Sequence, residues 1–75
     1  MNILAEITEI DVDKAGELQE GFLVASIKNV GLEEATVNGV ALEPGEAKGY
    51  PFVGKGYRKI AYDPNSSTLR IMQIF

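Results

Sequence analysis

The sequence predicts an all-β fold, a small antiparallel β-sandwich or barrel of about six short strands with tight turns. Short segments rich in β-branched and aromatic residues recur every 8–12 residues or so, separated by Gly, Pro and Asn. No segment keeps the period of an amphipathic helix for long. With 75 residues and no linker, repeat or low-complexity stretch, residues 1–75 are expected to form a single small β domain.

The first part of the chain is expected to supply two strands. Residues 2–10 are typical of the first, although their imperfect alternation indicates that both faces are partly covered. Residues 11–20 are polar and predict a long loop or one helical turn. Residues 21–30 (GFLVASIKNV) are the best candidate for a buried strand, because they are apolar and β-branched as far as Ile27.

Turn residues predict a hairpin in the middle of the chain. Asn38 and Gly39 join residues 35–37 to residues 40–42, and this dipeptide supplies the two positive φ angles of a type I′ turn. Residues 43–46 (EPGE) have the Pro and Gly positions that a type II turn prefers.

The rest of the chain is expected to add three strands. Residues 47–53 form the first, and Pro51 within them predicts an edge position or a bulge, because proline cannot donate to a sheet. After a turn and a loop, the remaining two strands are expected at residues 57–62 and 68–75.

The composition argues against most enzymes. The chain has no His, no Cys and no Trp, so a hydroxyl nucleophile would lack its usual base and no thiolate could hold a metal. Paired carboxylates could serve glycoside chemistry, but the candidate pairs lie beside turns of a domain too small for a deep cleft. These pairs are Glu33 with Glu34 and Glu43 with Glu46. We expect no catalytic residue, no cofactor and no metal.

Two motifs match only in part. Residues 49–55 have the G-x-x-x-x-G-K spacing of a phosphate-binding loop, but Gly56 replaces the required Ser or Thr and no helix is predicted to follow. Residues 11–16 (DVDKAG) begin like a calcium loop, yet the fifth and twelfth positions are Ala15 and Phe22 instead of oxygen ligands. A solvated acidic loop explains the second motif.

Size and charge point towards protein partners. A domain this small buries only about 60% of its unfolded surface, and without disulfides or a metal such domains often rely on another subunit. Residues 1–46 carry ten acids against two bases (net −8), whereas residues 47–75 carry five bases against one acid (net +4). This asymmetry predicts an anionic partner, complementary packing between copies, or neutralisation within one fold.

The sequence gives no indication of a membrane role. Its first residues lack a basic region, Glu6 and Glu9 interrupt the apolar run, and no segment approaches the roughly 20 apolar residues of a membrane span. The expected location is the cytoplasm, or a virion if the protein derives from a phage.

Residues 55–62 suggest an alternative function. They resemble part of the RNA-binding signature K/R-G-F/Y-G/A-F-V-x-F/Y, in which strand aromatics stack on bases. A single-stranded nucleic-acid-binding domain of OB type would use Lys55, Tyr57, Arg58, Lys59 and Tyr62. Arg58 and Lys59 depart from the signature, and the sequence pI of 4.6 weakens attraction to phosphates. A module that binds a small ligand or carbohydrate through Tyr50, Phe52 and Tyr57 is a third hypothesis.

The stretches NVG (29–31), ATVNGVALEPGEAKGYPF (35–52), KIAYD (59–63) and TLRIMQI (68–74) resemble a family of short all-β proteins encoded in the virion-structure regions of phages and prophages. The resemblance covers about residues 29–75. It implies a non-enzymatic virion accessory or assembly protein acting as an oligomer. For this leading hypothesis we predict that the last strand supplies core and interface through Leu69, Ile71, Ile74 and Phe75.

Overall fold

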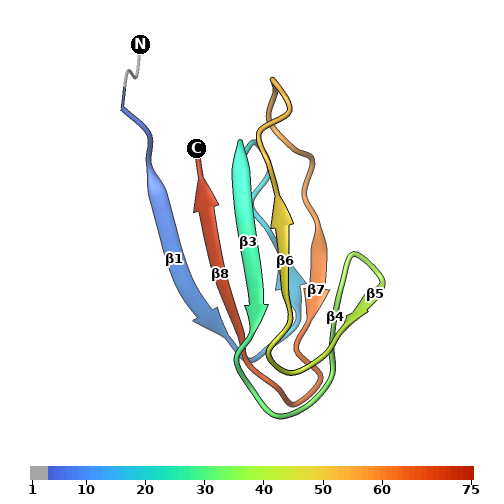
Figure 1. Ribbon diagram of the computed structural model, residues 1–75. Coiled ribbons are helices and arrows are strands. Elements are labelled where there is room, and N and C mark those ends of the chain that lie inside the picture. Colours follow the sequence, from blue (N-terminus) through green and yellow to red (C-terminus); the bar gives the residue numbers. More distant parts are fainter. Residues whose placement is uncertain (1–3) are drawn as a thin grey trace.

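The computed structural model describes residues 4–75, which form eight strands in two antiparallel sheets of four strands each, without a helix (Figure 1). The all-β prediction is confirmed, with eight strands instead of about six. Sheet I has the order β1-β8-β3-β6 and sheet II the order β2-β7-β4-β5. The strands are β1 (Ile7–Val12), β2 (Gly16–Glu17), β3 (Val24–Asn29), β4 (Ala35–Val37), β5 (Val40–Leu42), β6 (Ala47–Tyr50), β7 (Ala61–Asp63) and β8 (Leu69–Ile74).

The strand boundaries depart from the sequence prediction in three places. β1 continues to Val12 and a short β2 follows after three residues, because Asp11 and Val12 pair with β8 and Gly16 and Glu17 pair with β7. β6 ends before Pro51, at the edge of sheet I, as that proline predicted. The strand predicted at 57–62 is regular only from Ala61; before it, Tyr57 and Ile60 make isolated backbone bonds to residues 18–22.

The two predicted turns are confirmed. Asn38 (φ 53°) and Gly39 (φ 76°) form the two-residue connection between β4 and β5, with Val37 opposite Val40. In the next turn, the Glu46 amide donates to the Glu43 carbonyl oxygen at 2.9 Å and Gly45 has a φ of 84°. Both turns depend on local residue chemistry, and sequence alone therefore locates them.

Replacing Gly39 by alanine should destabilise the protein by about 1–2 kcal/mol, the cost of holding a residue with a Cβ in the left-handed region. A Cβ at Gly39 meets nothing within 4 Å, so backbone strain alone sets the effect. Urea denaturation would measure it. The matched control is Gly49→Ala, which is equally uncrowded but lacks a positive φ. Equal loss in both variants would contradict this account.

One core joins the two sheets. Alternate residues of the central strands of sheet I point into it: Ala25 and Ile27 on β3, Leu69 and Ile71 on β8. Sheet II contributes buried residues from β4 and β5. These sheet II residues are Ala35, Val37 and Leu42. The core also includes Leu18, Phe22 and Ile60, from the two segments (18–22 and 57–60) that are joined by isolated backbone hydrogen bonds.

A buried asparagine connects the loops at one end of the core. Asn29, with 0% of its surface exposed, donates from Nδ2 to the carbonyl oxygens of Glu33 (2.7 Å) and Leu42 (2.9 Å). Its Oδ1 accepts from the Gly31 amide (3.1 Å) and the Ser67 hydroxyl (2.6 Å). A side chain at Gly31 would collide with Ser67 and the next residue's amide, which explains the N-x-G pattern in physical terms.

Three aromatic rings close the other end of the core. Phe22 is fully buried and stacks on Tyr57, with ring centroids 4.8 Å apart, while Tyr50 meets both rings edge-on. The Tyr57 hydroxyl donates to the Pro51 carbonyl oxygen at 2.7 Å. The cluster therefore fixes the segment that follows β6 against sheet I.

Candidate functional site

Strand β1 leaves one of its backbone edges open. Glu6 and Phe75 exchange both backbone hydrogen bonds (3.2 and 2.8 Å), which sets the phase of the ladder between β1 and β8. Because such bonds alternate in an antiparallel pair, the N–H and C=O groups of Ile7, Glu9 and Asp11 point away from β8. Among residues 4–75 no strand pairs with that side of β1.

Apolar side chains are exposed on both faces of β1. Ile7 lies opposite Ile74 on the outer face of sheet I and is 60% exposed. Ile10 lies opposite the buried Ile71, on the core side, yet it is 53% exposed. Sheet II lies behind β3 and β6 and does not extend behind the middle of β1 (Figure 1). The core face of this strand is thus left without cover.

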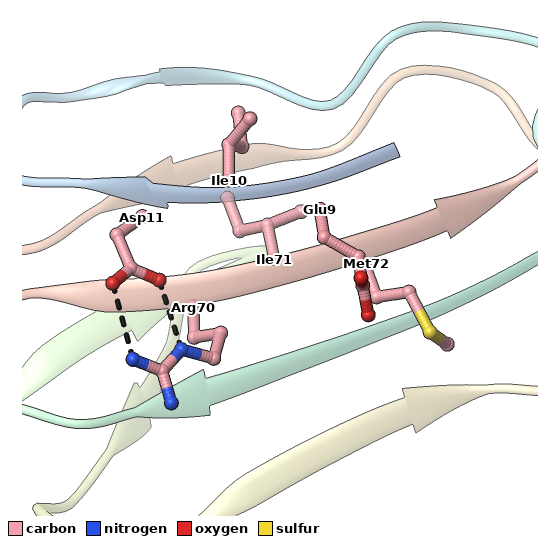
Figure 2. Close-up of a pocket in the computed structure, with 6 residues that line it drawn as sticks. All are labelled: Glu9, Ile10, Asp11, Arg70, Ile71 and Met72. Carbon is pink, nitrogen blue, oxygen red and sulfur yellow. Dashed lines mark hydrogen bonds and ion pairs between the residues drawn. The ribbon is translucent and has the colours of Figure 1, made fainter. Parts of the chain in front are cut away.

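Acidic side chains follow the same strand, and one of them is paired. Arg70 of β8 donates to both carboxylate oxygens of Asp11, at 3.0 and 3.2 Å (Figure 2). Glu9 lies beside Met72 on the same face, and none of the cations in residues 4–75 forms an ion pair with it. These residues line a shallow hollow between β1 and β8, together with Ile10 and Ile71. The arrangement provides an acidic and apolar surface.

The Arg70 guanidinium lowers the pKa of Asp11 below its ordinary value of 3.8, mainly through their hydrogen bonds. A depressed carboxyl pKa gives stability that is complete above pH 3.8 and is lost as the pH falls through the lowered value. In the Arg70→Met variant we expect the pKa of Asp11 to rise towards 3.8, as measured by NMR titration of the carboxyl carbon. Lys28→Met removes another cation from the same face and is the control; an unchanged Asp11 pKa without Arg70 would refute the pairing.

Strand β6 forms the opposite edge of sheet I and is basic and apolar. The bond from the Asn29 amide to the Glu46 carbonyl oxygen sets its phase, so the backbone groups of Ala47 and Gly49 face away from β3. Lys48 lies on this strand. The chain after it exposes Phe52 (61%) and Val53 (60%), followed by two further exposed bases, Lys55 and Arg58.

The predicted interface residues of the last strand divide between two environments. Leu69 and Ile71 are 0% and 1% exposed, so they belong to the core and cannot meet a partner in this fold. Ile74 and Phe75 are half-buried: Ile74 lies on the outer face between Ile7 and Val24. Leu69 and Ile71 face the core, whereas Ile74 is on the opposite face of the same strand.

The residues of the nucleic-acid hypothesis do not form one exposed aromatic face. Tyr57 stacks on Phe22, and the half-buried Tyr62 packs against the core with its hydroxyl close to Gly16. Lys59 lies 3.9 Å from a carboxylate oxygen of Glu17, while Lys55 and Arg58 are exposed. Single-stranded nucleic-acid binding stays a prediction from sequence.

The paired carboxylates are arranged differently from the sequence expectation. The Glu34 carboxyl hydrogen-bonds that of Glu43 and raises its pKa, and the Glu46 carboxylate accepts the Glu43 amide at 2.7 Å. Within residues 4–75 no group of three or more acidic side chains is arranged to hold a metal ion. None of these residues forms a helix long and apolar enough to cross a membrane.

Among residues 4–75, opposite charges from the two parts of the chain meet in two places, Glu17 with Lys59 and Asp11 with Arg70. Sequence reasoning expected partners and, through Pro51, an edge position or a bulge for the strand that became β6, but it missed the open edge of β1. The available signal was the presence of Ile7 and Ile10 on opposite faces of one short strand. Comparison with protein families, curated proteins and solved structures found no match to this chain.

Proposed function

We propose that this protein is a non-enzymatic interaction domain that binds other protein surfaces through the open edges of sheet I, as a homo-oligomer or on a larger assembly. One observation carries the proposal: β1 combines an unpaired backbone edge with exposed apolar side chains on both faces. The sequence resemblance adds a setting, the assembly of a phage or prophage virion.

The physical reason lies in what an edge strand offers. Unpaired N–H and C=O groups accept another strand, and proteins that avoid this place charges or proline at the edge. β1 has charges but also Ile7 and Ile10, whose exposed surface a neighbouring strand would cover on both faces at once. Glu9 and Asp11 then select the partner by charge instead of preventing every contact.

Light scattering over a concentration series tests the proposal. We expect the mass per particle to rise with concentration, and Glu9→Pro to abolish the rise. Proline at Glu9 removes a donor from the open edge and leaves the ladder to β8 intact, since the Glu9 amide points away from β8. Glu9→Ala is the matched control and should still associate. A protein that stays monomeric at high micromolar concentration and binds no virion component would refute the proposed function.

A further inference from the structure

We infer that the partner of β1 is a second copy of this chain, whose β6 extends sheet I in a head-to-tail arrangement. The inference rests on the proposed function and names its partner and polarity. Both edges belong to the same sheet, and neither is paired among residues 4–75. The contact would join two different surfaces, so one copy keeps a free β6, the other keeps a free β1, and further copies can add at both ends.

The strand directions fit this arrangement. All three neighbouring pairs in sheet I are antiparallel, so β6 runs opposite to β1. A copy placed beside the first without rotation would bring its β6 antiparallel to β1. The alternation of directions would then continue unbroken from one copy to the next.

The hydrogen-bonding phase also fits. The register places Glu9, Met72, Ser26 and Gly49 in one row across the outer face of sheet I. Glu9 and Gly49 end this row, and both direct their backbone groups outward. If the row continues level into the next copy, the two residues form a hydrogen-bonded pair with their outer faces on the same side. Asp11 and Ala47 form the next such pair.

The side chains of the two edges are complementary. In this register the exposed Asp11 of β1 would share its outer-face row with the small Ala47 of β6 and, one strand further in, with the exposed Lys28. Lys48 is half-buried and lies in the core-facing row, level with Ile10. The start of β1 and the loop after β6 lie at the same end of sheet I (Figure 1). That end exposes Leu4 and Ile7 on one edge and Phe52, Val53 and Lys55 on the other.

Pairing of β1 with β1 fits less well. Consider two β1 strands paired antiparallel, with the core faces of both copies on the same side of the joined sheet. In the register centred on Glu9, Glu9 lies opposite Glu9 of the other copy. In the register centred on Ile10, Glu9 lies opposite Asp11. Like charges opposite one another destabilise a strand pair. The acids of β1 therefore favour the basic edge over a second acidic one.

Disulfide trapping tests the contact, because the chain contains no cysteine of its own. The Glu9→Cys/Gly49→Cys variant places one thiol on each edge. Within one chain these positions are three strand spacings apart, roughly 14 Å, beyond the ~7 Å limit between bridged Cα atoms. Gly49 accepts a side chain, since its Cβ would meet nothing within 4 Å. Between copies the pair would lie at about 5.5 Å.

After mild oxidation we expect the double variant to give a ladder of dimers, trimers and higher species on a non-reducing gel. A mixture of the two single variants should give dimers that contain one chain of each. Efficient dimers from Glu9→Cys alone would show β1 pairing with β1, which overturns this inference but leaves the proposed function standing. Absence of crosslinks in a protein that light scattering finds oligomeric overturns the inference in the same way. Absence of crosslinks in a monomeric protein overturns both.

Discussion

Replacing Asn29 by alanine is expected to destabilise the protein by about 3–5 kcal/mol, estimated from the loss of several buried hydrogen bonds. A domain of this length has a free energy of unfolding of only about 4–11 kcal/mol, at 0.05–0.15 kcal/mol per residue. The variant should therefore lose between about a quarter and all of that free energy, whereas a surface substitution would change little.

The size of the effect follows from what Asn29 satisfies. Alanine would leave the Gly31 amide, the Ser67 hydroxyl and two backbone carbonyl oxygens without their partner; the bonds to Leu42 and Ser67 are buried, and those to Gly31 and Glu33 are partly buried. A buried polar group deprived of its bond costs about 1–3 kcal/mol. Because these groups belong to three separate segments, the loop after β3, the end of β5 and the loop before β8, their loss also frees the connections around Asn29.

Urea denaturation followed by circular dichroism measures this loss, and two serines calibrate it. Ser67→Ala removes one bond to Asn29 and should cost about 1–2 kcal/mol. Ser66→Ala, at the neighbouring exposed position, should be neutral within about 0.5 kcal/mol. An Asn29→Ala variant as stable as Ser66→Ala would show that the network contributes little.

The parts of the fold that the sequence predicted are those set by neighbouring residues. Asn38 and Gly39 favour one turn whatever surrounds them, and the apolar run before Lys28 is buried wherever it packs. The segments that were mispredicted take their structure from distant residues. Residues 11–12 and 16–17 became strand residues because β8 and β7 supply partners more than 40 residues away along the chain.

The sequence predicted that the protein has a partner, but it did not locate the open edge of β1 that forms the candidate site. Segregated charge and small size indicated a partner, and Pro51 indicated an edge position or a bulge for the strand that contains it. The edge position of β1 depends on the strand order, which no local pattern in residues 7–12 encodes. The last strand illustrates the limit. Its composition marks Leu69, Ile71 and Ile74 alike as apolar, but the two-residue period of the strand places Ile74 on the outer face, away from sheet II, where it is half-buried.

Substitution of Phe22, which packs against Tyr50 of β6, and of Phe52, which follows β6, should distinguish an effect on folding stability from an effect on association. Phe22→Ala should cost about 3–5 kcal/mol, because a fully buried ring leaves a cavity and its stacking on Tyr57 is lost. Phe52→Ala should change the free energy of unfolding by less than about 0.5 kcal/mol, since that side chain is 61% exposed.

The effects of Phe22→Ala and Phe52→Ala on association, measured by light scattering, should rank in a different order from their effects on the free energy of unfolding. Phe52→Ala should weaken association at unchanged stability, because Phe52 lies on the proposed contact surface beside β6. Phe22→Ala should affect association only as far as it unfolds the domain or frees the loop that Tyr57 anchors through Pro51. If Phe52→Ala associates like the unmodified protein, the loop after β6 is not part of the contact. If Phe22→Ala unfolds at the same urea concentration as Phe52→Ala, the aromatic cluster does not close the core as its burial indicates.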